Sequence, residues 1–139
     1  MDTNKIGKNT RILFYGPSRH GNGDMFQNMI QRLGEEETLE VYDRIEAFSQ
    51  RLRKPRGKVS IAVLAALSKS ELRDIISLAE LLLDLRVVLI LPDLKPETVS
   101  LAHRIAPRFV TDWSADLKGI RQVLRRLLAG TNRDRVAYR

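Results

Sequence analysis

Hydrophobic residues occur along the chain in two patterns: short continuous runs, and segments in which they recur every three or four positions. A continuous run is typical of a buried strand, and the spaced pattern is typical of an amphipathic helix. The continuous runs occupy residues 11–16, 39–43, 59–64, 86–91 and 108–112. A segment with helical spacing follows each of them, so the pattern predicts five consecutive units of strand and helix.

The predicted helices are marked by apolar positions on one face and by residues suited to their first turns. Ser68 and Glu71 have the spacing of a capping box before the third helix. Asp43 and Glu46 have the same spacing before the second helix. Pro96 suits the first turn of the fourth helix, where a missing N–H loses no hydrogen bond. The apolar positions are Met25, Phe26, Met29, Ile30 and Leu33 for the first helix, Ile45, Phe48 and Leu52 for the second, Leu72, Ile75 and Ile76 for the third, Val99, Ala102 and Ile105 for the fourth, and Leu117, Ile120, Val123, Leu124, Leu127 and Leu128 for the fifth.

Strict alternation of strands and helices predicts an α/β domain with a parallel sheet and helices on both faces. The length of 139 residues suits one domain. We expect this domain to span residues 11–129, between a flexible N-terminal tail (1–10) and a flexible basic C-terminal tail (130–139). A five-stranded, doubly wound sheet most often has the strand order 2-1-3-4-5, and it binds ligands beyond the carboxyl ends of its strands.

Composition excludes several classes of site. The chain has no cysteine, which rules out disulfides, thiolate metal sites and a cysteine nucleophile. His20 and His103 have no further ligand at metal-binding spacing, so we expect no metal site. The first ten residues are polar, and the apolar run at 87–91 is far shorter than a membrane span. We therefore expect a cytoplasmic protein that does not enter a membrane.

The net charge of +7 is unevenly distributed. One basic cluster is the predicted connection after the second helix, with Arg51, Arg53, Lys54, Arg56 and Lys58. The other lies on the fifth helix, opposite its apolar stripe, with Lys118, Arg121, Arg125 and Arg126. Such clusters can bind nucleic acid or an acidic protein surface, or can be no more than a solvated face. Because no aromatic residues are interleaved with them, we expect any nucleic-acid binding to be weak.

Residues 11–128 resemble a response-regulator receiver domain in length, order of elements and hydrophobic pattern. The resemblance implies a receiver or flavodoxin-like fold and a role in signal transduction. A working receiver has two acidic residues after its first strand, a phosphorylated Asp ending its third, a Ser or Thr ending its fourth and a Lys ending its fifth. At the matching places this chain has Tyr15-Gly16-Pro17, Leu64-Ala65-Ala66, Leu91-Pro92-Asp93 and Thr111-Asp112-Trp113.

With no phospho-acceptor and no lysine at these places, the chain resembles a degenerate receiver that works without phosphorylation, a pseudo-receiver. The resemblance implies that contacts are made by surfaces, commonly the fourth helix, fifth strand and fifth helix, which join copies or partner domains. On this chain the expected interaction residues are Trp113, Lys118, Arg121, Arg125 and Arg126. Trp113 has a second interpretation, as a lid over the core.

The segment from Tyr15 to Gly23 resembles the flavodoxin phosphate loop, which holds an anion at the start of a helix. The resemblance implies an anion site formed by Ser18, Arg19, His20 and Asn22. Here the loop is one residue longer, Gly23 replaces a hydroxyl, and 67–70 offers no ring to stack on a flavin. We expect no cofactor. A solvated turn whose glycines relieve backbone strain explains the same residues.

Asp93 and Asp112 end neighbouring predicted strands. Paired carboxylates can bind Mg²⁺, but Asp after a strand is also an ordinary turn residue. No nucleophile and base stand at a recognisable spacing, so we expect no enzymatic or catalytic residues.

The sequence therefore predicts a non-catalytic, receiver-like signalling module that binds a protein partner or a second copy of itself. Two alternatives stay open. One is a binder of a phosphorylated small molecule or nucleotide at residues 18–23, and the other is a weak nucleic-acid binder that uses the basic clusters.

Overall fold

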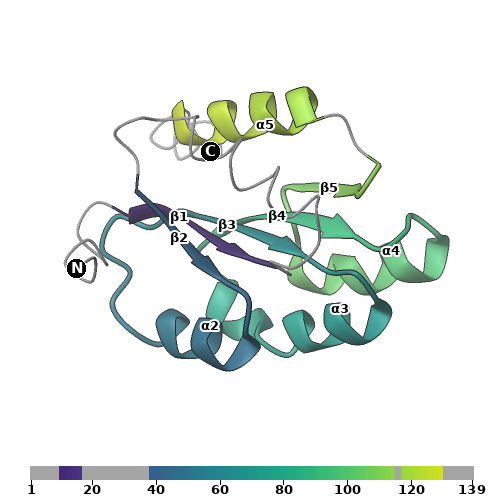
Figure 1. Ribbon diagram of the computed structural model, residues 1–139, viewed down its shortest axis with the longest axis horizontal. Helices are drawn as coiled ribbons and strands as arrows, with labels where there is room; N and C mark the ends of the chain where they lie inside the picture. The colour runs from purple at the N-terminus through teal and green to yellow at the C-terminus, as the bar shows by residue number, and fades with distance from the viewer. Residues whose placement is uncertain (1–9, 17–37, 115–116, 130–139) are drawn as a thin grey trace, which may run out of the picture.

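The computed structural model describes residues 10–16, 38–114 and 117–129. Within them, five parallel strands form one sheet in the order β2-β1-β3-β4-β5 (Figure 1). The strands are β1 (Thr10–Tyr15), β2 (Thr38–Tyr42), β3 (Ile61–Ala65), β4 (Arg86–Leu91) and β5 (Phe109–Asp112). The predicted fold class and strand order are confirmed, and every strand boundary lies within two residues of its predicted position.

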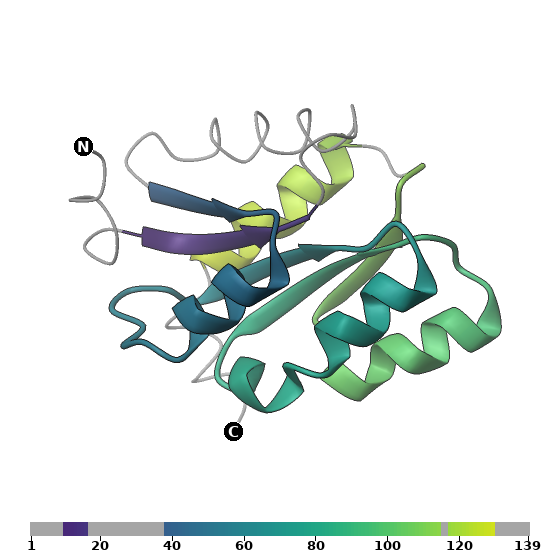
Figure 2. The same cartoon turned by 60° about the horizontal axis from the view of Figure 1, so that its bottom comes forward.

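Helices cover both faces of this sheet (Figures 1 and 2). One face carries α2 (Ile45–Leu52), α3 (Lys69–Ile76) and α4 (Pro96–Ala102), and the other carries α5 (Leu117–Ala129). Short 3₁₀ turns, η2 (Ala79–Leu82) and η3 (His103–Ile105), follow α3 and α4. The helix predicted between the first two strands lies outside the described residues. No helix in the described part of the chain is both long and apolar enough to cross a membrane.

The core is organised by β3, whose five residues are all at most 1% exposed. Ala62 and Leu64 face α2, α3 and α4, whereas Ile61, Val63 and Ala65 face α5. Burial of a Val, Leu or Ile side chain contributes about 1.5–3 kcal/mol, so a strand buried on both faces is strongly favoured in the middle of the sheet. The continuous apolar run in the sequence predicts this position because neither face of the strand meets water.

The two predicted capping boxes have different outcomes. Ser68 Oγ accepts a hydrogen bond from Glu71 N at 3.1 Å, and Glu71 Oε1 accepts one from Leu67 N at 2.7 Å. The cap of α3 is therefore confirmed. The prediction of a capping box before α2 is wrong. The N-cap residue of this helix is Arg44, which makes no side-chain capping bond.

Two predicted boundaries also need correction. Helix α2 continues to Leu52, so Arg51 lies in its last turn and not in the basic connection. Thr10, predicted to belong to the flexible tail, is the buried first residue of β1. Both corrections have the same physical cause, since each side chain takes part in one buried polar cluster. The rest of the two predicted tails, 1–9 and 130–139, lies outside the described residues.

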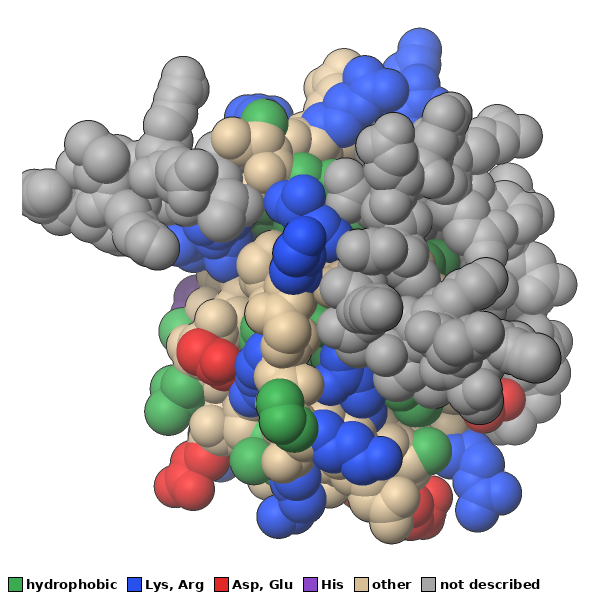
Figure 3. Space-filling model, turned by 90° about the vertical axis from the view of Figure 1, so that its left-hand side faces the viewer, with side chains coloured by type: hydrophobic (Ala, Val, Ile, Leu, Met, Phe, Trp, Pro, Cys, Tyr) green, Lys and Arg blue, Asp and Glu red, His purple; other side chains and the backbone are tan. Residues whose placement is uncertain are grey.

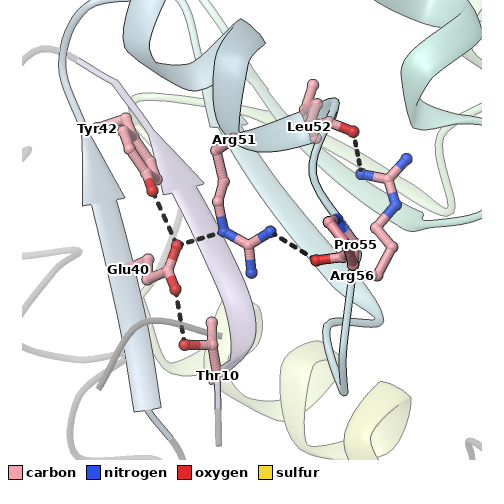
Figure 4. Close-up of polar contacts among 7 residues, drawn as sticks. All are labelled: Thr10, Glu40, Tyr42, Arg51, Leu52, Pro55 and Arg56. Atoms are coloured by element: carbon pink, nitrogen blue, oxygen red, sulfur yellow. Dashed lines mark hydrogen bonds and ion pairs between the residues drawn. The ribbon is translucent and has the colours of Figure 1, made fainter. Parts of the chain in front are cut away.

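This buried cluster centres on Glu40 of β2 (Figure 4). Arg51 Nε lies 2.7 Å from Glu40 Oε1, and the two side chains are 4% and 8% exposed. Thr10 Oγ1 and Tyr42 Oη each donate a hydrogen bond of 2.8 Å to the same carboxylate. Arg51 Nη1 also donates to Pro55 O at 3.2 Å. The cluster thus ties α2 and the connection after it to the edge strand β2 and to β1.

The environment of Glu40 favours its charged form. Burial by itself raises the pKa of this carboxyl, but hydrogen bonds from Arg51, Thr10 and Tyr42, with the charge of Arg51, outweigh it and lower the pKa below 4.5. Burial and the bond to Glu40 raise the pKa of Tyr42 to about 12, so its hydroxyl remains a donor. The cluster is therefore a carboxylate, a guanidinium and neutral donors.

We predict that Glu40→Gln lowers the free energy of unfolding at pH 7 by about 3–5 kcal/mol, because it leaves the buried Arg51 charge without its partner. The lowered pKa makes the ion pair's contribution complete above pH 4.5 and lost as the pH falls through the folded-state value. Urea unfolding followed by circular dichroism at several pH values measures both effects, and the variant should lack this acid-dependent loss.

Glu46→Gln is the matched control, because it makes the same change in an exposed ion pair. The Glu46 side chain is 72% exposed, and its Oε1 lies 3.9 Å from Arg44 Nε. The free energy of unfolding of this variant should differ from that of the unmodified protein by no more than about 0.5 kcal/mol. Unfolding curves that coincide for the Glu40 and Glu46 variants at pH 7 would contradict the assignment.

Candidate functional site at the carboxyl end of the sheet

The carboxyl ends of the parallel strands meet at one edge of the sheet, where the fold class predicts a site. Gly16 N donates to Tyr42 O at 3.0 Å, which joins the ends of β1 and β2. Ala66 N donates to Ile90 O at 2.9 Å, which joins the ends of β3 and β4. These bonds bring the ends of β1 and β2, and of β3 and β4, together at this edge.

The described ends of β1 and β3 at this edge are buried and apolar. Gly16 is buried, and Ala65 and Ala66 are each 1% exposed. A Cβ atom placed on Gly16 would lie 3.0 Å from the Ala65 Cβ and 3.3 Å from two ring carbons of Phe14. Glycine is required here by this close approach, because even a methyl group is crowded. The described ends of the first and third strands are therefore closely packed against each other at Gly16 and Ala65.

Trp113 covers the same edge. Its indole Nε1 donates a hydrogen bond of 2.8 Å to Ala66 O, and its ring packs against the core cluster on the α5 face of the sheet. These contacts fit the interpretation of Trp113 as a lid over the core. A buried or half-buried Trp needs such a partner for its N–H. The role of Trp113 as an anchor for a partner stays a prediction.

At this edge Asp93 and Asp112 are engaged in local turns. Asp93 Oδ1 accepts a hydrogen bond from Lys95 N at 2.9 Å. Asp112 Oδ1 accepts bonds from Ser114 N at 3.3 Å and Ser114 Oγ at 2.8 Å. These contacts agree with the interpretation of both as turn residues. The described residues include no group of three or more His, Asp or Glu that could hold a metal ion.

The predicted anion site cannot be compared with the structure. Ser18, Arg19, His20 and Asn22 all lie outside the described residues, and the site stays a prediction.

The predicted interaction residues on α5 point away from its packed stripe. Ile120 and Leu124 are 1% and 0% exposed, which confirms the apolar face. Of the basic residues, Arg121 is half-buried, and the others are exposed: Lys118, Arg125 and Arg126.

The basic cluster after α2 is smaller than predicted. Arg51 is buried in the Glu40 cluster. Arg56 holds Asp84 through Nε at 3.1 Å and Nη2 at 2.9 Å, and it donates to Leu52 O at 3.0 Å. Arg53, Lys54 and Lys58 remain exposed.

One hollow in the surface is not predicted from the sequence. It lies between α3 and α4 and is lined by Lys69, Arg73, Glu97, Ser100, Leu101 and Arg104. Lys69 Nζ lies 3.8 Å from Glu97 Oε2 across it. The sequence offers one signal for this hollow, the expected pairing of the third and fourth strands. This pairing places the helices that follow β3 and β4 side by side.

No protein-family model matches this sequence, and no curated protein matches it. Among solved structures, the chain is similar to two proteins described as related to pilus assembly. One, from Burkholderia pseudomallei, has a TM-score of 0.63 and 21% identity, covering 89% of this chain and 92% of that one. The other, CpaE from Burkholderia thailandensis, has a TM-score of 0.61 and 21% identity, covering 86% and 98%.

The chain is also similar to a response regulator from Thermotoga maritima, with a TM-score of 0.59 and 11% identity, covering 86% of this chain and 98% of that one. At these identities the likeness concerns the fold. The strand order and the division of helices between the two faces are those of the receiver-like fold.

We predict that Gly16→Ala lowers the free energy of unfolding by about 1–3 kcal/mol, because the added methyl group overpacks the contact with Ala65 and Phe14. Gly119→Ala is the control, and its expected effect on the free energy of unfolding is the opposite one. A Cβ on Gly119 meets nothing within 4 Å, and alanine favours a helix over glycine by about 0.5–1 kcal/mol. Urea unfolding compares the two variants, and equal stabilisation by both would show that the sheet edge is not closely packed.

Proposed function

We propose that this chain is a receiver-like signalling module that works without aspartyl phosphorylation and acts through contacts with proteins rather than through catalysis. The observation that carries the proposal is the apolar, closed carboxyl end of the sheet. There Ala65 and Ala66 are buried, Gly16 packs against Ala65, and Trp113 is bonded to Ala66 O.

Aspartyl phosphorylation requires a carboxylate nucleophile, a bound Mg²⁺ and a cation that neutralises the phosphoryl group. At the end of β3 the side chains of Leu64, Ala65 and Ala66 offer no nucleophile. Asp93 and Asp112 remain at this edge, but each is held in the turn that follows its strand. The packing therefore supports a receiver-like module that no longer carries this chemistry.

Similarity to a solved response regulator supports a role in signalling, and similarity to two proteins described as related to pilus assembly is compatible with it. Neither similarity identifies a partner. A module without its own chemistry has to signal by binding, so its surface becomes the functional site.

The surface that we assign to binding is formed by α4, β5 and α5. In the described part of the sheet, β5 pairs with β4 alone, and its four residues are half-buried. Helix α5 follows β5 in the chain and carries the cations Lys118, Arg121, Arg125 and Arg126. A second copy of the chain is a suitable partner if α4 and β5 form the contact, because two basic α5 faces would repel one another when placed face to face.

Treatment with acetyl phosphate and Mg²⁺ should leave the protein unmodified, because the end of β3 has no acceptor carboxylate. Intact-protein mass spectrometry measures this result directly, with a phosphorylatable receiver domain as the positive control. A base-labile phosphoryl group on an aspartate would contradict the proposal.

Self-association should occur at micromolar concentration and should weaken about tenfold or more in Arg121→Glu with Arg125→Glu, because these cations can pair with Asp112 of the other copy. Sedimentation velocity measures the association, and circular dichroism shows whether the fold is retained. Arg53→Glu with Lys54→Glu makes the same change in net charge away from this surface and should leave association unchanged. A monomer at tens of micromolar would overturn the dimer but not the absence of phosphorylation.

A further inference from the structure

Cations from separate parts of the sequence converge at the amino end of the sheet, opposite the closed edge. Figure 3 looks onto this side of the molecule, the side from which the strands of Figure 1 begin, and Lys and Arg side chains form a band along its described surface. Asp and Glu side chains lie towards the edges of the view.

Backbone hydrogen bonds place the strand beginnings next to one another. Ser60 N donates to Arg11 O at 3.1 Å, and Arg86 N donates to Ser60 O at 2.9 Å. Arg108 N donates to Val87 O at 2.8 Å. Arg11, Arg86 and Arg108 therefore begin or precede neighbouring strands along one edge.

Two further groups reach the same end. The connection between α2 and β3 contributes Lys54 and Lys58, which are exposed. Helix α5 runs back towards the start of the strands, and Arg86 Nη1 donates to Leu127 O in its last turn at 2.8 Å. The adjacent residues Arg125 and Arg126 are exposed. Some residues of each of the two basic clusters that are separate in the sequence thus lie on one basic face.

Two acids of the described residues lie near this basic face. Asp84 is bonded to Arg56, and Glu80 is exposed on η2. The cations are Arg11, Arg53, Lys54, Arg56, Lys58, Arg86, Arg108, Arg125 and Arg126. Because these residues lie on strand ends, a short connection and a packed helix, the fold holds their positive charges together.

We propose that this basic face binds the phosphate backbone of double-stranded nucleic acid without reading its sequence. Four neighbouring strands, β1, β3, β4 and β5, span about 14 Å at the usual strand spacing of about 4.8 Å. Phosphates on one strand of a duplex recur about every 3.4 Å along its axis. An edge of this width can lie along about four phosphates, and the exposed cations of the connection and of α5 widen the contact.

The composition of the face favours a duplex over other anionic partners. A bilayer surface is bound through inserted apolar residues as well as charge, and Leu83, 81% exposed, is the large exposed hydrophobic residue at this end in the described part of the chain. A protein interface needs an apolar core, which one leucine does not supply. Single strands are bound by stacking on aromatic rings, and the cations of this face have none among them.

The test is fluorescence anisotropy of a labelled duplex of about 20 base pairs, titrated with the full chain between about 50 mM and about 200 mM salt. Lys54→Gln with Lys58→Gln should weaken binding roughly tenfold or more and should reduce the salt slope by about two. Arg73→Gln with Arg104→Gln removes the same charge from the hollow between α3 and α4 and should change affinity less than about twofold. Circular dichroism checks that both variants fold.

Three results would overturn the proposal: no binding of the duplex at the lower salt concentration, equal weakening by both double variants, or binding to vesicles with anionic lipids in place of the duplex. Equal weakening would mean that net charge alone attracts the polymer. None of these outcomes affects the proposed absence of phosphorylation, which rests on the opposite end of the sheet. Self-association is tested separately, by the variants at Arg121 and Arg125.

Discussion

The complete burial of β3 is the constraint on which the rest of the structure depends. A strand with neighbours on both sides and helices on both faces can carry only apolar side chains, and Ile61–Ala65 meets this condition. The amphipathic helices follow from it, because they must cover the two faces. The same packing continues past the end of the strand to Ala66 and Trp113. The constraint that builds the core thus extends to the carboxyl end of the sheet, where the proposed function places its decisive observation.

The cluster around Glu40 solves a different problem, the placement of α2 against the edge of the sheet. Apolar contacts alone would allow this short helix to shift along the sheet. The ion pair and the two further hydrogen bonds to Glu40 fix one position of the cluster. Arg51 Nη2 is buried with no hydrogen-bond partner among the described residues. An incompletely satisfied guanidinium is costly, so the cluster is better understood as a device for specific placement than as a source of maximal stability.

The strands, their order and the cap of α3 could be predicted because each depends on residues close together in the sequence. The run at 86–91 reproduces β4, and Ser68 with Glu71 forms the expected cap. The end of α2 could not be predicted in this way. Arg51 resembles the first residue of a basic connection, and its buried partner Glu40 is revealed only by the tertiary fold.

The candidate sites show the same division between local and long-range information. The absence of an acceptor at Leu64, Ala65 and Ala66 is visible in the sequence, whereas the bond from Trp113 to Ala66 joins residues far apart in the chain. Isolated residues such as Arg11 and Arg108 do not form a cluster in the sequence, because only the register of a parallel sheet places them on one edge.

In the described part of the chain, cations gather at one end of the strands, which contributes an electric dipole along the sheet. Cations lie where the strands begin, while Asp43, Asp93 and Asp112 lie where they end. In the electric field of a charged partner, such a molecule is oriented before contact, so its orientation is selected during diffusion. Ionic strength then controls chiefly how often productive encounters occur, whereas contacts formed after the encounter control how long they last.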